Sequence, residues 1–581
     1  MTGHQHGNCC FISRGEPREQ SGETVGFSLL YSGNFLIEAQ VNETGRLRVN
    51  VGIHPETFSW FLRAGDSFST PECVIVRSDS GMGGCSRTLH RLFTDLLIPT
   101  DPSSARPPVL LNTWEAQYFS INGESVVAMA KHIKDKEVGI DLIVIDDGWN
   151  RDDDLSGLGD WIVDETKFPQ GFRRVSDELN AVGIRLGLWL EPEMVSISSN
   201  LNQRNPEWAL RVPDRALQVG RNQVVLDLSR GDVRDYLFAT ISRLLHSANI
   251  EYLKLDMNRP LAEIYSQAMP PERLCADLCT TDKCAPMIWQ SEVAHRYVLG
   301  VYELLHRVRA AFPHVIIETC ASGGGRLDPG MLFYSDQVWI SDNTDALSRL
   351  KIQYGASYVY PCRCLGAHIS SVPNHITGNT TRLRTRAFVA LSGTFGFELN
   401  IFEATQAELD FYRAVVLLFR EIQPIVFLGD FYRLWNPFIV PYAAWMFVSR
   451  DQRDAVVFAF SLNSDHFSNL VPRLQLQGLR RDAEYEVLEP IPNNVSQGRG
   501  NLRIVESSTP CYQLGYESCV LTGGILMSCG LPVRFYTLDD SVMFRLMQVD
   551  KKREGARSSK LTFPSIDSDS SSSPSPAVDN P

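Results

Sequence analysis

Two rhythms of apolar and polar positions divide the chain. From Gly26 to about Leu97, short apolar runs alternate with polar residues and are punctuated by Gly and Pro, which predicts antiparallel β-structure. From about Gly429 to Leu546 the alternation returns, in runs such as AAWMFVSR and AVVFAFSL, and predicts a C-terminal antiparallel β-sandwich. We therefore expect β-domains on both sides of a different central region.

The central region combines short apolar strands with longer helical segments, at Gly123 to Glu137, Val233 to Ala248 and Glu292 to Ala311. Strand–helix repetition over roughly 300 residues favours a parallel sheet, and the length suits a closed (β/α)8 TIM barrel of the α/β class. A doubly wound open sheet is the alternative, but no Gly-rich phosphate turn follows an early strand. The strand segments are VLLNTW, LIVIDDGW, RLGLWLEPE, YLKLDMN, VIIETCASGGG, QVWISDN and GTFGFELN.

These rhythms predict four parts. We expect an N-terminal β-domain over residues 1–100, the barrel over 106–425, the C-terminal β-sandwich over 426–548 and a tail over 549–581. The tail ends in a run of Ser, Asp and Pro that cannot bury enough apolar surface to fold, so we expect it to be disordered.

Charge and hydropathy narrow the possible partners. The net charge is −13 and the clusters of Lys and Arg are short, so we expect no binding to nucleic acid or to an anionic membrane. No apolar run approaches the length of a membrane span. The first twenty residues are polar and lack the apolar core of a signal peptide, but secretion stays possible if the true start is upstream. We therefore leave the location unassigned.

Acidic and aromatic residues gather at the ends of the predicted barrel strands. Those ends meet on one face of a barrel, where barrel enzymes build their sites. Aromatic rings cover the apolar face of a sugar, while carboxylates and Lys bond its hydroxyls, so the pattern predicts a sugar site. His is nearly absent there, which argues against Mg²⁺ or Zn²⁺. The residues are Trp114, Glu115, Asp146, Asp147, Trp149, Trp189, Glu191, Glu193, Lys254, Asp256, Cys320, Ser322, Trp339, Asp342, Asn343 and Asp345.

Two of these carboxyls fit the pair that glycoside hydrolysis requires. Asp256 ends a buried strand two residues after Lys254, which would keep it ionised and aimed as a nucleophile; the alternative is a structural pairing with Lys254 or Arg259. Asp342 could be desolvated enough to stay protonated as the acid. The residues leave Asp345 and Asp147 open for either role, although Asp345 fits a helix N-cap better.

A cysteine cluster is the other candidate for a metal site. Cys275, Cys279 and Cys284 lie close in sequence, but no His lies between Pro270 and Ser291 to complete a zinc site. We expect no metal and no organic cofactor.

Between about Pro108 and Asn400 the chain closely resembles the α-galactosidases of glycoside hydrolase family 36. The resemblance is specific because many long words occur in the same order. These words are NTWEA, DDGW, LGDW, GLWLEPEMVS, VLDLSR, LKLDMNR, CASGGGRLDPGML, SDNTDALSRLKIQYG and PNHITGN.

The resemblance implies a role for each matching residue. Asp256 would be the nucleophile and Asp342 the acid/base of a retaining double displacement. Cys320 and Gly323 would lie near the 2-OH and favour galactose over its N-acetyl relative. Galactose hydroxyls and ring faces would be held by Asp146, Asp147, Lys254, Arg221, Trp114, Trp189 and Trp339.

The implied activity is release of terminal α-galactose from oligosaccharides of the raffinose and melibiose type. The alternatives are an α-N-acetylgalactosaminidase and an inactive fragment that binds galactosides. A raffinose-synthase type of galactosyl transferase uses the same barrel but departs from several of these words.

The chain departs from the family pattern at three places. About a hundred residues precede the barrel, and SLLYSGNFLIEAQV resembles only the later part of the family's N-terminal β-supersandwich, so we expect a partial, truncated domain. Close relatives are homotetramers in which that domain helps to complete a neighbouring subunit's site, and this puts the same assembly in question here. The segment from Pro270 to Gln290 and the Ser-rich tail are expected to be additions to the family pattern.

Overall fold

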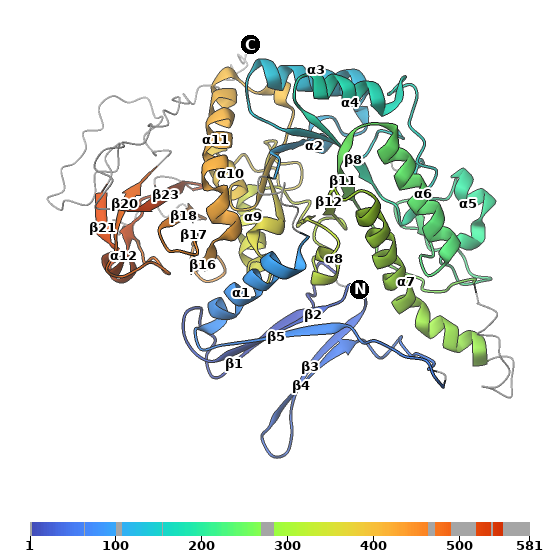
Figure 1. Cartoon of the computed structure of the whole chain (residues 1–581), viewed down its shortest axis with the longest axis horizontal. Helices are drawn as coiled ribbons and strands as arrows, with labels where there is room; N and C mark the ends of the chain where they lie inside the picture. Colours follow the sequence, from blue (N-terminus) through green and yellow to red (C-terminus); the bar gives the residue numbers. More distant parts are fainter. Residues whose placement is uncertain are drawn as a thin grey trace, which may run out of the picture.

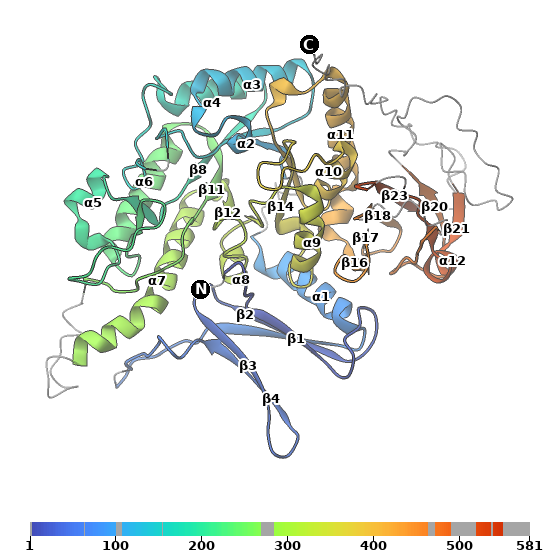
Figure 2. The same cartoon turned by 180° about the vertical axis from the view of Figure 1, so that it is seen from behind.

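The structure, a computed structural model, describes residues 3–62, 64–99, 107–153, 155–268, 284–462, 471–489, 519–535 and 538–549, with side chains in α7 from residue 290 onward. A strand barrel with surrounding helices forms the centre of the molecule, the N-terminal strands lie along one side of it, and the C-terminal sheet packs beside α11 (Figure 1). The view from behind shows the same order (Figure 2). Cys275, Cys279 and the predicted tail from residue 550 lie outside the described residues, as does the side chain of Cys284.

Eight parallel strands close into a barrel, which confirms the predicted fold class. Their hydrogen-bonded order is β6-β7-β8-β11-β12-β13-β14-β15, and β15 pairs with β6 to complete the ring. The strands are β6 (Leu110–Asn112), β7 (Leu142–Ile145), β8 (Arg185–Leu190), β11 (Ile250–Leu255), β12 (Ile316–Thr319), β13 (Gln337–Trp339), β14 (Leu365–Ser370) and β15 (Thr394–Glu398).

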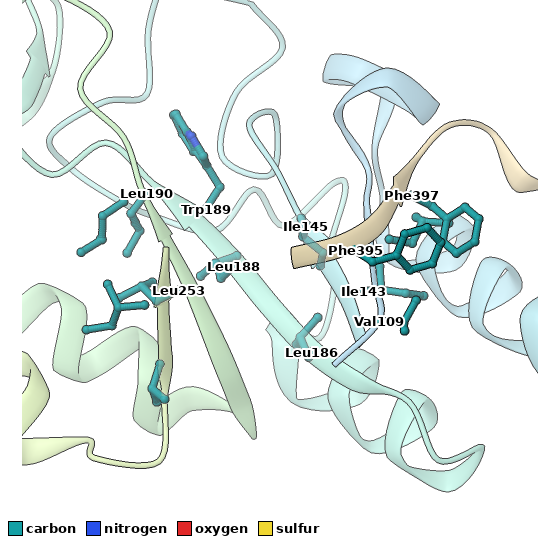
Figure 3. Packing of buried hydrophobic residues seen from close by; sticks show 14 of the residues in the cluster. Val109, Ile143, Ile145, Leu186, Leu188, Trp189, Leu190, Leu253, Phe395 and Phe397 are labelled. Atoms are coloured by element: carbon teal, nitrogen blue, oxygen red, sulfur yellow. The ribbon is translucent and has the colours of Figure 1, made fainter. Parts of the chain in front are cut away.

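Most barrel strands carry apolar residues on both faces because both faces are buried. In β7, Ile143 and Ile145 belong to the large core that also contains helix residues, whereas Leu142 and Val144 belong to a second cluster with Tyr252 of β11. Neighbouring strands continue the large core through Leu186, Leu188, Leu253, Phe395 and Phe397 (Figure 3). A continuous apolar run therefore marks strands such as β7 in the sequence.

The sequence did not reveal β14. Its residues, LGAHIS, contain one β-branched side chain, at Ile369, and follow a 3-10 turn over Cys362–Cys364. All six residues are buried because β14 is inserted between β13 and β15. That burial depends on partners distant in sequence, so local propensity could not show it.

The predicted helices are present with ends shifted by a few residues at most, except that α7 begins earlier. Asn122 and Ser125 form a capping box that begins α3, and Thr405 and Glu408 form one that begins α11. The principal helices of this region are α3 (Gly123–Asp135), α4 (Gly171–Ala181), α6 (Gly231–Ser247), α7 (Cys284–Ala311), α9 (Ala346–Ala356), α10 (Leu383–Ala390) and α11 (Gln406–Leu428), and the short ones are α2 (Trp114–Gln117), α5 (Asn200–Arg204) and α8 (Pro329–Leu332).

The N-terminal region contains two small antiparallel sheets. One has the order β1-β2-β5, and the other is the β3–β4 hairpin, which projects away from the barrel in both views (Figures 1 and 2). The strands are β1 (Cys9–Ser13), β2 (Thr24–Leu30), β3 (Phe35–Val41), β4 (Leu47–Ile53) and β5 (Glu72–Ser78).

The expectation of β-structure throughout this region was wrong at α1 (Gly81–Leu92). The helix buries Cys85 and Leu89, which lie four residues apart on one face. Its glycines resemble turn signals in the sequence but serve packing: a Cβ on Gly83 would lie 2.5 Å from the carbonyl oxygen of Glu19. The glycines therefore let the N-terminal segment pack closely against the helix.

The C-terminal region has a six-stranded antiparallel sheet in the order β16-β17-β18-β23-β20-β21. One face, with Trp445, Phe447 and Phe458, joins the barrel core, and the other face forms a second core with β19, β22 and α12. These elements are β16 (Asp430–Trp435), β17 (Tyr442–Val448), β18 (Asp454–Ser461), β19 (Arg473–Leu474), β20 (Glu484–Leu488), β21 (Cys519–Thr522), α12 (Gly523–Ser528), β22 (Leu531–Pro532) and β23 (Ser541–Gln548).

None of the helices described here combines the length and the hydropathy that crossing a membrane requires.

Candidate active site

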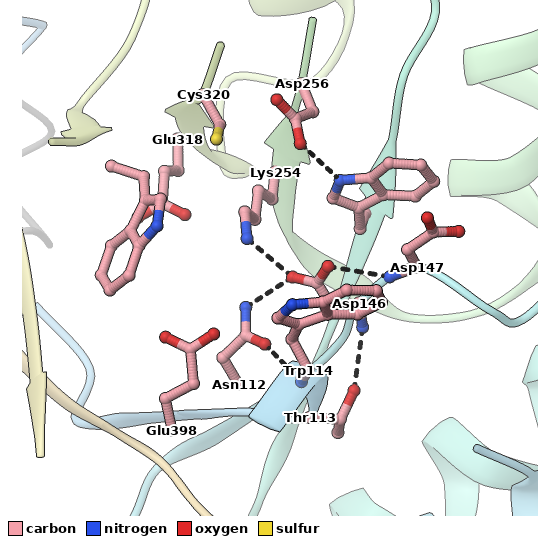
Figure 4. Close-up of polar contacts among 12 residues, drawn as sticks. Asn112, Thr113, Trp114, Asp146, Asp147, Lys254, Asp256, Glu318, Cys320 and Glu398 are labelled. Carbon is pink, nitrogen blue, oxygen red and sulfur yellow. Dashed lines mark hydrogen bonds and ion pairs between the residues drawn. The ribbon is translucent and has the colours of Figure 1, made fainter. Parts of the chain in front are cut away.

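Asp146 lies at the centre of the polar groups that the strand ends bring together (Figure 4). Its Oδ2 accepts hydrogen bonds from Asn112 Nδ2 at 2.6 Å and from Lys254 Nζ at 2.7 Å, and its Oδ1 accepts from the Asp147 amide at 2.8 Å. The Asp146 amide donates to Thr113 Oγ1 at 3.0 Å. The ends of β6, β7 and β11 thus meet at one buried carboxylate.

Lys254 is held as a buried ammonium. Burial disfavours its charge, but Asp146 and then Cys320, Glu398 and Glu318 act in the opposite direction, and together they raise the pKa of Lys254 well above its ordinary value. Among these groups Asp146 forms the ion pair. The sequence left open a structural ion pair between Lys254 and Asp256. In the structure Lys254 pairs with Asp146 instead.

Asp256 follows β11 and is oriented by three donors. Trp189 Nε1 donates to its Oδ2 at 3.2 Å, Asn258 Nδ2 donates to the same oxygen at 2.9 Å, and the Met257 amide donates to Oδ1 at 2.8 Å. Arg259, the other structural partner considered, donates instead to backbone carbonyls, including that of Gln218 at 3.2 Å. Donors to both oxygens fix a carboxylate in one orientation.

Asp342 follows β13, and its side chain is exposed, whereas that of Asp256 is buried. Partial desolvation by the surrounding protein raises the pKa of Asp342 first, and the charge of Asp256 raises it further. Trp339 Nε1 donates to Asp342 Oδ1 at 3.1 Å and acts in the opposite direction. The role of Asp342 as a protonated acid stays a prediction, and its electrostatic response to Asp256 places the two carboxyls in one site.

Cys320 and Gly323 form a tight turn beside Asp342. The Gly323 amide donates to the buried Sγ of Cys320 at 3.4 Å. Gly323 has a φ of +79°, and a Cβ there would lie 2.7 Å from Ser341 Cα and 2.8 Å from the amide nitrogen of Asp342. Only glycine fits this position without displacing the backbone that carries Asp342.

The three predicted wall residues differ in their surroundings. Trp189 and Trp339 are buried, whereas Trp114 is half-buried and meets Tyr118 and Phe119 edge to face. Trp189 donates a hydrogen bond to Asp256, whereas Trp114 is held by its contacts with aromatic neighbours. The role of each ring as a sugar wall stays a prediction.

Asp147 and Arg221 are two further residues that the sequence predicts to bind substrate. Arg151 Nε donates to Asp147 Oδ1 at 2.8 Å, and Figure 4 shows the Asp147 carboxylate turned away from that of Asp146. Arg221 is exposed in a turn with a φ of +50°, and its charge lowers the pKa of Glu191 in opposition to burial. Arg221 therefore lies within electrostatic reach of Glu191.

Some strand-end residues support the fold instead of facing the central polar group. Trp149 is fully buried, stacks near Trp161 and donates to the Trp189 carbonyl at 2.9 Å. Glu193 accepts from Arg326 Nη1 at 2.7 Å. Asp345 is the N-cap of α9, where its Oδ2 accepts from the Ser348 amide at 3.1 Å, so the predicted capping role is confirmed.

The sequence reasoning missed several buried partners of the site. Glu398 ends β15, and burial and then the charge of Glu115 raise its pKa well above the ordinary value. Nδ1 of His368, on β14, lies 3.2 Å from Glu398 Oε2. Burial lowers the pKa of His368 well below the ordinary value. The strand-end rule applied to GTFGFELN could have found Glu398, whereas His368 lies on the strand that was not predicted.

The arrangement combines two carboxyls of different character with a buried Lys–Asp pair. A carboxyl with a raised pKa can donate a proton near neutral pH, while a carboxylate with donors on both oxygens can attack an electrophilic carbon. No three His, Cys, Asp or Glu side chains converge as a metal site within the part of the chain that the structure describes.

Comparison with known proteins identifies the family. Residues 67–429 match the model of the melibiase family, residues 1–63 match the N-terminal domain of glycosyl hydrolase family 36, and residues 442–546 match its C-terminal domain. The alpha-galactosidase AgaA of Geobacillus stearothermophilus is 47% identical over 471 residues, which are 81% of this chain and 62% of AgaA. Alpha-galactosidase 1 of Pediococcus pentosaceus is 42% identical over 472 residues, again 81% of this chain and 62% of the relative.

Solved structures agree. A crystal structure of an AgaA variant in complex with raffinose has a TM-score of 0.84 at 42% identity, over 94% of this chain and 70% of that one. The chain spans about 62% of the length of the two curated relatives. These matches confirm the resemblance noted in the sequence: the chain belongs to the melibiase family, within glycosyl hydrolase family 36.

Proposed function

We propose that this chain is a retaining α-galactosidase that releases terminal α-galactose from oligosaccharides of the raffinose and melibiose type. The observation that carries the proposal is the pair Asp256 and Asp342, at the carboxyl ends of β11 and β13. One carboxylate is held by donors on both oxygens, and the other carboxyl has its pKa raised by partial desolvation and by its partner's charge. That difference is what a nucleophile and an acid require.

In the first step Asp342 protonates the glycosidic oxygen while an oxygen of Asp256 attacks C1. The C1–O bond to the leaving group breaks, and a galactosyl ester forms on Asp256. In the second step Asp342, now ionised, takes a proton from water as that water attacks C1 and the ester breaks. Both carboxyls return to their starting states, and the product keeps the α-configuration.

The remaining predicted residues bind galactose in this proposal. Asp146 and Asp147 accept hydrogen bonds from hydroxyls, Lys254 and Arg221 donate to others, and Cys320 with Gly323 lines the 2-OH. The rings of the substrate pocket are Trp114, Trp189 and Trp339. Support comes from AgaA, whose variants are solved with raffinose and with stachyose.

Release of p-nitrophenol from p-nitrophenyl α-galactoside tests the activity, and Asp256→Ala is the control. The first sugar seen by proton NMR should be α-galactose, because double displacement retains configuration. β-Galactose as the first product would exclude the mechanism. Turnover that survives Asp256→Ala would remove Asp256 from it, and a folded chain that binds galactose without turnover would favour the inactive fragment.

A further inference from the structure

Glu115 links three loops around the proposed acid. It follows Trp114 in α2 at the end of β6, and its side chain is 1% exposed. Its Oε1 accepts from Thr344 Oγ1 at 2.6 Å, and its Oε2 accepts from the Ser371 amide at 3.1 Å. One carboxylate thus joins the loop after β13 to the loop after β14.

Thr344 brings this link close to the reacting groups, because it lies two residues after Asp342. Its Oγ1 donates to Glu115 and also accepts from Asn374 Nδ2 at 2.8 Å, and its carbonyl accepts from Ser370 Oγ at 3.1 Å. Thr344 is 5% exposed, so these bonds are protected from water. The backbone beyond Asp342 is therefore fixed from two neighbouring loops.

The same carboxylate reaches His375, whose Nδ1 lies 3.3 Å from Glu115 Oε1. The hydrogen bond with Glu115 raises the pKa of His375, and the charge of Asp342 adds to the effect. The side chain of His375 is 35% exposed. The loop after β14 therefore carries a basic group from the solvent side toward Asp342, and Glu115 holds it there.

We infer that Glu115 is a positioning residue for Asp342: through Thr344 and the loop after β14, it holds the acid at the distance that proton transfer to the glycosidic oxygen requires. The inference rests on the proposed function. Loops move more than strands, and a shift of about 1 Å is enough to cost a reaction about 100-fold. An acid carried on a loop therefore needs cross-links of this kind.

The chemistry of the leaving group distinguishes positioning from general support. p-Nitrophenolate leaves without a proton, whereas the sugar alkoxide released from raffinose needs one. kcat/KM reports steps up to bond cleavage, so loss of a correctly placed acid lowers it for raffinose and spares p-nitrophenyl α-galactoside. A general disturbance of the pocket lowers both.

Two substitutions break the link at different points. Glu115→Gln replaces one of the two carboxylate oxygens with an NH2 group. That group donates hydrogen bonds, so either the bond from Thr344 or the bond from the Ser371 amide is lost. Thr344→Val removes the hydroxyl and leaves Glu115 in place. Thr344→Ser keeps the hydroxyl and removes only the methyl group. Asp328→Asn is the matched control, because Asp328 is a buried carboxylate that accepts from Ser32 Oγ at 2.6 Å and the Met331 amide at 2.9 Å.

We expect Glu115→Gln and Thr344→Val to lower kcat/KM for raffinose about 10- to 100-fold and that for p-nitrophenyl α-galactoside by no more than about threefold. Thr344→Ser should restore raffinose turnover, and Asp328→Asn should change both substrates by equal factors. Equal losses on both substrates in the two test variants, or no loss, would overturn the inference. If Glu115→Gln does not fold, the Val and Ser variants of Thr344 decide alone. A folded parent chain that turns over neither substrate overturns the proposed function, and the inference with it.

Discussion

Lys254 Nζ lies 2.7 Å from Asp146 Oδ2 and ties the end of β11 to the end of β7, two strands that β8 separates. Both side chains are at least 93% shielded from solvent. A buried pair of this kind stabilises little compared with an apolar substitute, but loss of one partner leaves an uncompensated charge. Substitution of either residue alone should therefore lower the stability of the protein.

Lys254→Met should lower the free energy of unfolding by about 3 kcal/mol, because Asp146 is then buried without its cation. Urea titration measures the change. Lys131→Met is the control: Lys131 pairs with Glu178 at 2.9 Å on the surface, with 57% of its side chain exposed, and should cost less than about 1 kcal/mol. Equal losses in the two variants would show that burial of the Lys254 pair is energetically unimportant.

Glu191 should lower the free energy of unfolding as the pH rises from about 4.5 to about 8. Burial, and then the charge of Asp256, raises the pKa of Glu191 to about 8 from an ordinary 4.5. Between these values the unfolded chain releases the proton and the folded chain keeps it, so stability falls by up to about 1.4 kcal/mol per pH unit. Below 4.5 and above 8 this contribution is constant.

The measurement compares the parent with Glu191→Gln in urea titrations from pH 4 to pH 9. The stability difference should move in favour of the variant as pH rises through the window and then level off. Glu56→Gln, a substitution at an exposed side chain, should give a flat difference. A flat difference for Glu191→Gln as well would mean that Glu191 is ionised in the folded protein.

Trp339→Phe should shift the basic limb of the pH profile of kcat/KM upward. The Trp339 hydrogen bond favours the charged form of Asp342 and lowers its pKa, in opposition to partial desolvation. Without that donor Asp342 keeps its proton to higher pH, and the limb should move to higher pH. Trp189→Phe removes a donor from Asp256 instead and should leave the basic limb in place. A downward shift in Trp339→Phe would contradict Asp342 as the acid.

Gly323→Ala should abolish most turnover in a chain that still folds, since its Cβ would meet Ser341 Cα at 2.7 Å and displace Asp342. Gly183→Ala is the matched control, because Gly183 has a φ of +82° and no atom within 4 Å of the added Cβ. Both variants carry the cost of a positive φ, about 1 kcal/mol, which thermal unfolding measures. Undiminished kcat in Gly323→Ala would show that the loop can relax.

The strand ends could be predicted from sequence because a barrel brings them together whatever its details. Asp256, Asp342 and Lys254 follow apolar runs that local patterns reveal. Their partners could not be predicted in the same way. Lys254 pairs with a residue 108 positions earlier in the chain, and Glu115 reaches a threonine 229 positions later.

The errors in the fold have a related cause. β14 is a strand because β13 and β15 bury it, and α1 is a helix although three glycines stand in its first turn. In both segments tertiary packing overrides weak local preference. Asp345 shows the opposite case, since an N-cap depends on residues three positions apart and was predicted correctly.

The C-terminal sheet has a consequence for how the molecule unfolds. Trp445 Nε1 donates to Ser392 Oγ at 2.9 Å, and the aromatic face around Trp445 shares one core with the barrel. Detaching the sheet would expose the apolar surface of this face and of the helices that it covers. A partly unfolded state would therefore have a high free energy, because the barrel and the sheet would both expose apolar surface. The barrel and the sheet should therefore melt together in one cooperative transition, and the isolated barrel would be an aggregating fragment instead of a smaller enzyme.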